Sequence, residues 1–415
     1  MKANTDDTRR PTLLWVNQFA LLPADGGGTR HFELGRELVR RGWRVTIAAS
    51  DLHLHKRTYT RRSSPQDRRV IAETVEGVDL RWLWTPSYVG NDWRRVRNWL
   101  GFRSAVLRDG VGGMRPDIVI GSSPQLFAAT AARTLARRLG VPFVFEVRDL
   151  WPESLEAAGG RRGLAYAYLA RVANGLYRDA DRILVLARGT GEYLVERGIS
   201  ADKIINVPNG VDVQAVPSSA LVPQSADSNR ALTLVYAGAH GPANGLEQVL
   251  AAAAELEDEL AVRFLLIGDG PVKTALREEA ARRGLNNVEF HDPVSKPRLM
   301  ELLQSADAGL MVLRDSPLFS FGVSPNKLFD YLAASVPVIC NVGGEVADML
   351  QRASAGIQVR DSSSAALAEG VRRLAATSAS ERKRMGASGY QWVKQEHGRD
   401  VLGARLDGFL RELLS

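Results

Sequence analysis

The sequence predicts an α/β protein made of two doubly wound domains in tandem. Its 415 residues exceed one ordinary domain of about 150 residues. Short apolar runs alternate with helical patterns along the chain, and strands that are apolar on both faces are typical of a parallel sheet covered by helices on both sides. This rhythm pauses at 214–230, a segment with two prolines and four serines that we interpret as a linker, and then restarts.

The first half of the chain holds six apolar runs that predict strands. These runs lie at 12–19, 43–49, 78–84, 117–122, 142–147 and 182–187. Helical periodicity follows most of them and begins near Thr29, Trp93, Gln125, Gly163 and Arg188.

The second half repeats this pattern after the linker. Its strands are expected at 231–238, 262–270, 287–292, 308–313, 337–342 and 356–360, with helices between them. The last residues predict two helices, 380–396 and 400–414. Two doubly wound domains direct the carboxyl ends of their strands toward a common cleft, and ligands bind at such ends. We therefore expect the chemistry just after each strand.

Composition excludes several classes of protein. Hydrophobic residues make up 45% of the chain and charged residues 24%, which is typical of a globular protein with an ample core. No apolar run reaches the roughly 18 residues of a membrane span. The single Cys340 excludes a disulfide framework and indicates a reducing compartment. The six histidines show no metal-binding spacing, so no metal cofactor is expected.

The charge is distributed unevenly along the chain. Residues 1–200 hold 32 Lys and Arg against 21 Asp and Glu, whereas the remainder holds 22 against 26. Such asymmetry indicates that the first half meets an anionic surface, namely nucleic acid, membrane or a phosphorylated substrate.

A glycine-rich loop follows the first predicted strand. Gly26, Gly27 and Gly28 precede a helix that Thr29 could cap, so backbone N–H groups could approach an anion closely there. A tight strand-to-helix turn explains the same glycines. Arg30 favours the ligand, because a cation in the first helical turn opposes the helix dipole unless an anion lies nearby.

The segment 321–344, FGVSPNKLFDYLAASVPVICNVGG, contains a second helix start. Ser324 is a good N-cap residue and Pro325 suits the first helical position. Lys327 falls in the first turn, where a bound phosphate would make a cation favourable. Asp330, three residues on, could accept hydrogen bonds from both hydroxyls of a ribose. An intrahelical pair between Lys327 and Asp330 on a solvated face explains the same spacing.

This segment resembles a known family. SPNKLFDYLAASVPVI is similar to the P-x-K-x-x-E-Y-x-A-x-G-x-P-V-I pattern of retaining family 4 glycosyltransferases, which have the GT-B fold. Four other stretches resemble the same family along nearly the whole chain, and EVRDLWPES at 146–154 is similar to its O-antigen and capsule branch, which includes N-acetylfucosamine transferases. The four stretches are GGGTRHFELGRELVRRGWRVTI, PNGVD, YAGAHGPANGLEQVL and LIGDGPVKTAL.

The resemblance implies two Rossmann-like domains facing a central cleft. An acceptor-binding domain would span 1–210 and a nucleotide-sugar-binding domain 211–397, with the C-terminal helix 398–415 a candidate to pack back on the first. Arg148, Asp149 and Lys327 are the implied catalytic residues, because the first two fall where many members have His-Asp near the transferred sugar. The implied donor-binding residues are Gly27, Gly28, Gly238, His240, Gly268, Ser324, Pro325, Asn326, Lys327, Leu328 and Asp330.

The chain departs from the family pattern at several positions. Gly322 stands where a first carboxylate is usual, and Asp330 is one methylene shorter than the usual Glu. Ser335 replaces a glycine. The Arg and Lys that clamp the diphosphate in many members fall near Ala239 and Asn244, so His240 or Arg314 would have to substitute.

Glu146 lies inside the apolar strand PFVFEV, where an unpaired charge is unfavourable. Arg148 is two residues on and on the same face of the strand, which makes it the expected partner. A supporting ion pair and a direct role in acceptor binding both fit this pattern.

Two basic segments lie in the first half. Residues 56–69 carry six Lys and Arg without apolar periodicity, which predicts a mobile loop. In 92–110 the aromatic residues Trp93 and Trp99 alternate with Arg94, Arg95 and Arg97 at helical spacing, a pattern that suits a bilayer interface. A surface helix packed on the sheet and a nucleic-acid contact are the alternatives.

The main hypothesis is a retaining glycosyltransferase. It would move a sugar, such as N-acetylfucosamine or another N-acetylhexosamine, from a UDP-sugar to a polyprenyl-diphosphate-linked saccharide in O-antigen, capsule or exopolysaccharide synthesis. We expect a metal-independent enzyme, peripheral on the cytoplasmic face of the inner membrane. A nucleotide-sugar 2-epimerase of the same architecture and a non-catalytic nucleotide-sugar-binding subunit are the alternatives. A nicotinamide dehydrogenase is disfavoured, because no GxGxxG follows the first predicted strand.

Overall fold

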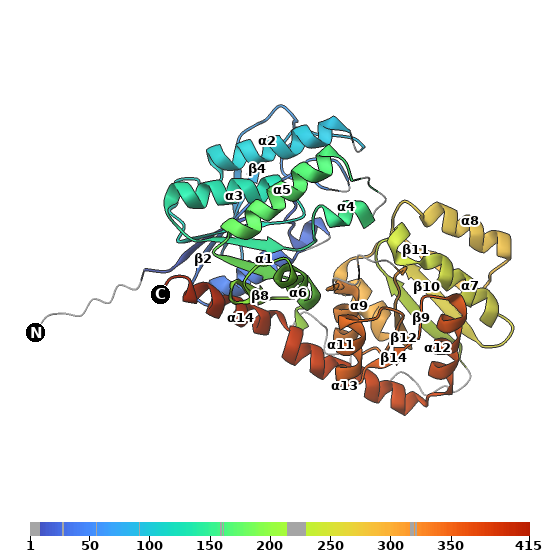
Figure 1. Cartoon of the computed structure of the whole chain (residues 1–415). Helices are drawn as coiled ribbons and strands as arrows, with labels where there is room; N and C mark the ends of the chain where they lie inside the picture. The colour runs from blue at the N-terminus through green and yellow to red at the C-terminus, as the bar shows by residue number, and fades with distance from the viewer. Residues whose placement is uncertain are drawn as a thin grey trace, which may run out of the picture. The chain divides into compact units, whose positions relative to one another are not determined.

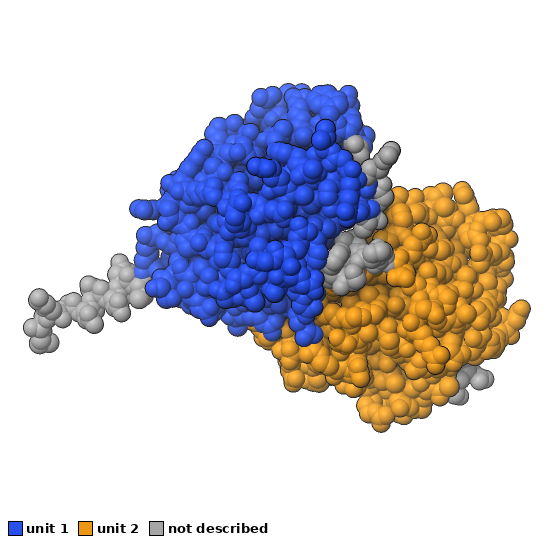
Figure 2. All heavy atoms as spheres, in the orientation of Figure 1, with its two compact units in different colours: residues 1–207, 402–415 blue, residues 208–401 orange. Residues whose placement is uncertain are grey.

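A computed structural model of the chain shows two compact units (Figures 1 and 2). Unit 1 comprises residues 1–207 and 402–415, and unit 2 comprises residues 208–401. The boundary between the units therefore lies between Val207 and Pro208, whereas the sequence predicted it between residues 210 and 211. The structure describes residues 9–26, 29–54, 56–90, 92–157, 160, 162–213, 230–315, 319 and 322–415, so all of the predicted linker except its last residue lies outside the described part.

Unit 1 is built on an eight-stranded sheet in the order β3-β4-β2-β1-β5-β6-β7-β8. All of its neighbouring strands are parallel except β3 and β4, which are antiparallel. The strands are β1 Thr12–Val16, β2 Arg44–Ser50, β3 Ile71–Val75, β4 Val78–Leu83, β5 Ile118–Ser122, β6 Phe143–Val147, β7 Arg182–Val185 and β8 Ile204–Asn206. Every residue of β1, β5 and β6 is buried, as expected for strands covered on both faces.

Seven helices are described in or reaching into unit 1, and a side chain caps the start of two of them, whereas Thr29 does not cap α1. Asp92 caps α2 by accepting a hydrogen bond from the Arg94 amide, and Gln125 caps α3 in the same way. The helices are α1 Arg30–Arg40, α2 Trp93–Asp109, α3 Leu126–Leu139, α4 Glu153–Ala157, α5 Leu164–Asp179, α6 Arg188–Glu196 and the C-terminal α14 Arg399–Glu412.

The end of α14 belongs to the core of unit 1, although it is the last segment of the chain. Leu402, Leu406 and Leu410 are fully buried in the same cluster as the residues of β1 and β2. The Trp43 indole donates a hydrogen bond of 2.6 Å to the Asp407 carboxylate. The second half of α14 therefore completes unit 1 structurally.

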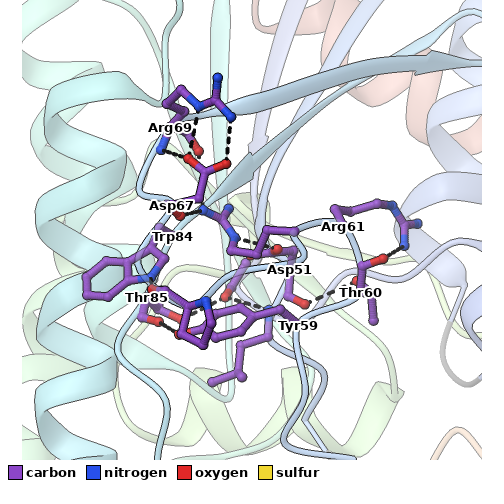
Figure 3. A network of polar contacts seen from close by, with 12 residues as sticks. Asp51, Tyr59, Thr60, Arg61, Asp67, Arg69, Trp84 and Thr85 are labelled. Carbon is purple, nitrogen blue, oxygen red and sulfur yellow. Dashed lines mark hydrogen bonds and ion pairs between the residues drawn. The ribbon is translucent and has the colours of Figure 1, made fainter.

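The basic segment 56–69 is not the mobile loop that its composition predicted. Arg62 is buried and forms an ion pair of 2.7 Å with the buried Asp51, which directly follows β2. Arg61 binds Asp25 at 2.8 Å and Glu73 at 3.0 Å. The Tyr59 hydroxyl donates to the Thr85 carbonyl (Figure 3). The arginines of this segment therefore fasten it to the carboxyl end of the sheet.

Unit 2 is a six-stranded parallel sheet in the order β11-β10-β9-β12-β13-β14. This is the strand order of a dinucleotide-binding doubly wound domain. Its strands are β9 Leu232–Ala237, β10 Val262–Ile267, β11 Val288–His291, β12 Ala308–Met311, β13 Val338–Cys340 and β14 Gly356–Gln358. Its helices are α7 Leu246–Leu256, α8 Lys273–Arg283, α9 Lys296–Gln304, α10 Asn326–Ala333, α11 Glu345–Ala353, α12 Ser364–Ala376 and α13 Ala379–His397. Apolar clusters fill both faces of this sheet.

Candidate functional site

The candidate site of unit 2 lies where its strand order reverses, between β9 and β12. In an open doubly wound sheet, ligands bind outside the carboxyl ends of the strands at this point. Gly238 directly follows β9, and Gly268 directly follows the neighbouring β10. The side chain of Lys327, from α10, reaches to the same end of β9, since its Cε lies beside the position that a Cβ on Gly238 would take. The fold therefore brings three of the sequence-predicted donor residues together.

Lys327 is held by Tyr236, which sequence reasoning did not single out, and by Asn244, which it named only as a position without a positive charge. Its ammonium donates to the Tyr236 hydroxyl at 3.1 Å and to the Asn244 side-chain oxygen at 2.9 Å, and it lies 4.4 Å from the centre of the Tyr236 ring. Tyr236 lies inside the apolar strand β9 and therefore resembled a core residue. No carboxylate within the described ranges forms an ion pair with Lys327. Burial lowers the pKa of the Lys327 ammonium to about 8.

For a nucleotide diphosphate bound beside Lys327, as the sequence predicts, this lowered pKa would make the binding depend on pH. A diphosphate beside Lys327 favours the charged ammonium, so binding raises its pKa and takes up a proton above pH 8. The affinity for UDP should be full below pH 8 and fall by up to about tenfold per pH unit above it. Calorimetric titrations with UDP from pH 7 to 9.5 would measure this dependence. In Lys327→Met the slope should disappear, and an unchanged slope in that variant would refute the assignment.

Glycines allow the backbone to fold tightly around this site. Gly268 has a φ of +150°, and a Cβ there would collide with the carbonyl oxygen of Gly238. Gly270 has a φ of +157°, and a Cβ there would collide with the backbone of His240. Only glycine fits these two positions, because the loops after β9 and β10 are in direct contact.

Neither candidate substitute for the missing diphosphate clamp is a free cation. The His240 side chain is fully buried between Tyr236 and Phe290, at ring-centroid distances of 6.0 and 6.2 Å. Burial lowers the pKa of His240, and Lys273 adds to the effect, so the imidazole is neutral at pH 7. Arg314 is paired with Glu247 of α7 at 2.6 Å. Of these three candidates, Lys327 is the cation that pairs with no carboxylate of the described residues.

Asp330 does not pair with Lys327 as the local alternative predicted. Its carboxylate forms an ion pair with Lys296, the first residue of α9. The Asp330 side chain remains 18% exposed, so hydroxyl groups of a ligand can still reach it. Leu328 is fully buried in the core of unit 2, which leaves its side chain no contact with a ligand.

The start of α10 differs in detail from the prediction. The helix begins at Asn326, which is exposed, and Pro325 occupies the N-cap position without a side-chain cap. Ser324 therefore does not cap the helix. Its hydroxyl accepts a hydrogen bond of 2.8 Å from the Asn209 amide, and its carbonyl accepts one of 2.7 Å from the Asn209 side chain. The PNGVD motif thus fastens the beginning of α10.

A buried polar network lies at the corresponding switch point of unit 1. The Glu146 carboxylate binds Arg30 at 3.0 Å, His31 at 2.8 Å and the Ser122 hydroxyl at 2.5 Å. The predicted partner Arg148, which lies just beyond the end of β6, is not among these contacts. Burial would raise the pKa of Glu146, but His31 and Arg30 hold it well below its usual range. The anion that Arg30 required is therefore Glu146 and not a ligand.

Arg148 and Asp149 follow β6 at the carboxyl edge of the same sheet. The Ser123 hydroxyl accepts hydrogen bonds from the amides of Arg148 at 2.8 Å and Asp149 at 3.2 Å, which fixes their backbone. The Asp149 side chain is exposed. Gly27 and Gly28 lie outside the described residues, so the predicted glycine loop is described only at Gly26 and Thr29.

The predicted bilayer residues lie in the first turns of α2. Trp93, Arg94 and Arg97 are exposed, whereas Arg95 stacks on the Trp99 ring at 5.0 Å. Within the described ranges, no group of three or more His, Cys, Asp and Glu side chains could hold a metal ion. The same ranges contain no helix that is long and apolar enough to cross a membrane.

Two family models match the chain, one for each unit. The model described as "Glycosyl transferase 4-like domain" matches residues 25–210, and the model described as "Glycosyl transferases group 1" matches residues 231–377. Together these ranges cover well over half of the chain.

The chain is also similar to curated bacterial proteins. It is 31% identical to the putative colanic acid biosynthesis glycosyl transferase WcaI of Escherichia coli, over 53% of this chain and 56% of that protein. It is 25% identical to the probable glycosyltransferase WbjE of Pseudomonas aeruginosa, over 58% of this chain and 62% of that protein. The similarity thus spans little more than half the length of these relatives.

Solved structures share the fold over nearly the whole chain. The sucrose-phosphate synthase of Thermosynechococcus elongatus has a TM-score of 0.71 at 16% identity and covers 98% of this chain and 99% of its own. HepE of Anabaena, solved in complex with UDP and glucose, has a TM-score of 0.67 at 14% identity and covers 97% and 100%. These likenesses confirm the predicted GT-B fold. The chain belongs to the glycosyltransferases that combine a glycosyl transferase 4-like domain with a glycosyl transferases group 1 domain.

Proposed function

We propose that this protein is a retaining glycosyltransferase that moves a sugar from a UDP-sugar to a polyprenyl-diphosphate-linked saccharide during synthesis of an O-antigen, capsule or exopolysaccharide. The proposal rests on the position of Lys327 at the switch point of unit 2, where this partly buried cation pairs with no carboxylate of the described residues. The UDP complex of HepE supports the donor class. The names of WcaI and WbjE support a role in polysaccharide assembly. An N-acetylhexosamine such as N-acetylfucosamine is the proposed sugar.

The chemistry required of these residues is mainly charge stabilisation. The bond between the anomeric carbon and the diphosphate breaks, and the acceptor hydroxyl forms the new bond on the same face of the sugar. The hydroxyl proton passes to the departing phosphate, so the reaction needs no separate general base. Lys327 and the N–H groups at the start of α10 would stabilise the negative charge that develops on the diphosphate. We propose that they do so without a metal ion.

In this proposal Asp330 binds the ribose hydroxyls, and unit 1 binds the acceptor. Arg148 and Asp149 lie at the carboxyl edge of the unit 1 sheet, where a doubly wound domain binds its ligand. Their backbone is fixed by Ser123. They would orient the acceptor hydroxyl there. The protein would act at the cytoplasmic face of the inner membrane, because a polyprenyl-linked acceptor lies in the bilayer.

Titration of wild type and Asp330→Ala with UDP, GDP, ADP and NAD tests the donor site. Wild type should bind UDP selectively, and Asp330→Ala should bind it about 10- to 100-fold more weakly, because hydrogen bonds to a charged group contribute about 1.5–3 kcal/mol. Lys296→Met removes the ion-pair partner of Asp330 and should leave the UDP affinity within about threefold of wild type. Asp258→Ala, which changes an exposed carboxylate of unit 2, is the matched control.

Each other outcome changes the proposal in a defined way. Unchanged UDP affinity in Asp330→Ala would refute the site. Preference for GDP would keep the transferase and change the donor. NAD binding would favour a dehydrogenase. UDP binding without transfer to any lipid-linked acceptor would favour a nucleotide-sugar 2-epimerase or a binding subunit.

A further inference from the structure

One face of the unit 1 sheet is polar at its amino end. Thr12 of β1 pairs with Arg44 of β2, so these two side chains lie on the same face of the sheet. Thr46 of β2 pairs with Asp79 of β4 on that face, and Arg81 follows Asp79 two residues later. Strands that helices cover on both faces are normally apolar on both. This end of the face is therefore not built to pack against an apolar helix.

A cavity of about 1120 Å³ lies over this end of the sheet, and all of its lining residues belong to unit 1. Its volume is sufficient for a small molecule, since ligand pockets usually enclose about 300–1,000 Å³. We call it the arginine cavity, because five arginines and only two carboxylates line it. The arginines are Arg9, Arg10, Arg44, Arg81 and Arg115, and the carboxylates are Glu73 and Asp79.

Most of the positive charge in the arginine cavity is not neutralised by the protein. Arg9 is paired with Asp117 at 3.3 Å. The other four arginines form no ion pair with a described residue. Of the two carboxylates, Glu73 is already paired with Arg61 at 3.0 Å. An anion that enters the cavity therefore meets an excess of cations.

Arg81 is held in place by the loop that follows α2. The Asp109 carbonyl accepts hydrogen bonds from its Nε at 3.0 Å and its Nη2 at 2.8 Å. Gly112, which has a φ of +59°, allows this arrangement, because a Cβ there would collide with the Arg81 guanidinium. A cation that is already fixed loses little further freedom when an anion binds.

Two buried hydroxyl groups line the same cavity without a partner. Thr12 and Thr46 are only 8% and 6% exposed. Their side-chain hydroxyls form no hydrogen bond with a described residue. Buried polar groups are normally hydrogen-bonded. These hydroxyls therefore indicate a ligand that supplies the missing acceptor.

We propose that the arginine cavity binds a soluble anion that carries two or more phosphate groups. Arginine forms strong, charge-assisted hydrogen bonds with phosphate oxygens. Arg44 of β2, Arg81 of β4 and Arg115, which precedes β5, border the cavity from separate elements, so that they can contact more than one phosphate. The hydroxyls of Thr12 and Thr46 can donate to the same oxygens.

Other occupants fit the arginine cavity less well. None of the described large apolar side chains that are exposed lines it, so it offers a bilayer no group to insert. The described lining contains no aromatic ring on which a nucleobase could stack. The cavity lies at the amino edge of the sheet, whereas Arg148 and Asp149 follow the carboxyl end of β6. A ligand in it would therefore leave the proposed acceptor site free, and the inference does not depend on the donor.

Calorimetric titration of the full chain with tripolyphosphate tests this inference. The titrations use the Lys327→Met background, because the donor-site cation could also bind this anion. The Lys327→Met protein should bind tripolyphosphate at least about tenfold more tightly than orthophosphate, since only the longer anion reaches several arginines. Adding Arg44→Gln should weaken the binding about tenfold, and adding Arg44→Gln/Arg115→Gln about 100-fold, because a hydrogen bond to a charged group contributes about tenfold or more.

Two further variants separate a built site from diffuse surface charge. Thr46→Val keeps the shape of the side chain and removes only the hydroxyl, so it should weaken tripolyphosphate binding about 3- to 10-fold. Arg138→Gln/Arg171→Gln removes two exposed cations of unit 1 outside the cavity and should leave the affinity unchanged. Saturating tripolyphosphate should raise the melting temperature of the Lys327→Met protein, but not of the variant that also carries Arg44→Gln/Arg115→Gln.

Four results would overturn the inference. One is the absence of tripolyphosphate binding in Lys327→Met. Another is an unchanged affinity after Arg44→Gln/Arg115→Gln. The third is an equal loss in Arg138→Gln/Arg171→Gln, because binding would then reflect the overall charge of unit 1. The fourth is binding to phosphatidylglycerol vesicles that Arg44→Gln/Arg115→Gln weakens while tripolyphosphate does not compete, because the cavity would then bind a lipid headgroup.

Discussion

Lys327→Met should lower the rate constant for sugar transfer by about 100- to 1,000-fold. Removal of one group that stabilises a developing oxyanion has an effect of this size in other enzymes. Methionine keeps the length of the apolar stem and removes only the charge. The measurement is the release of UDP from the donor that the titrations select, with a bacterial membrane fraction as the source of acceptor.

The same substitution should not destabilise the protein. The Lys327 ammonium is partly buried beside Tyr236 and Asn244, and burial already lowers its pKa to about 8. Removal of a desolvated charge without a carboxylate partner should leave the melting temperature unchanged or raise it. Lys383→Met, which changes an exposed lysine of α13, should affect neither transfer nor stability. A transfer rate within threefold of wild type in Lys327→Met would exclude this lysine from the chemistry.

Glu146→Ala should lower the free energy of unfolding of unit 1 by about 3–5 kcal/mol. This is the usual effect of removing one member of a buried ion pair, because the remaining charge, here Arg30, stays buried without a counterion. Glu146→Gln keeps the shape of the side chain, so it should lower the free energy of unfolding by less than Glu146→Ala does. Seven of the eight tryptophans lie in unit 1, so denaturant unfolding followed by tryptophan fluorescence reports on this unit.

Two further variants separate pairing from burial. Glu192→Ala changes an exposed carboxylate of α6 and should stay within about 0.5 kcal/mol of wild type. The double variant Arg30→Met/Glu146→Leu removes both charges and should be more stable than Glu146→Ala alone. If Glu146→Ala lowered the free energy of unfolding by less than about 1 kcal/mol, the network would not stabilise unit 1 as its geometry indicates.

The main strands could be predicted because they are apolar on both faces. All twelve predicted strands occur, and the five helix starts named for the first half agree with the structure to within one residue. The two strands that the pattern did not reveal are β3 and β8. In β3 partly buried and exposed residues alternate, and β8 has only three residues, so neither has a continuous apolar run.

The partners of charged residues could not be predicted, because they come from distant parts of the chain. Local spacing assigned Arg148 to Glu146, whereas the real partner Arg30 lies 116 positions away. In the same way Arg62 appeared to belong to a solvated run until the structure placed it against Asp51. At Ser335, by contrast, a local feature explains the sequence pattern. The φ of Ser335 is +58°, a backbone conformation that favours glycine, which is why the family pattern has glycine there.

The contribution of α14 to the core of unit 1 has a consequence for protein synthesis. Leu402, Leu406, Phe409 and Leu410 are the last core residues of unit 1 to be translated, although the rest of that core precedes residue 208. Domains generally fold in order as they leave the ribosome. Here unit 1 cannot complete its core until the whole of unit 2 has been translated, so part of its apolar surface stays uncovered during that time. The unit that begins first is therefore completed last, and any ribosome that stalls before residue 402 leaves it without its final helix.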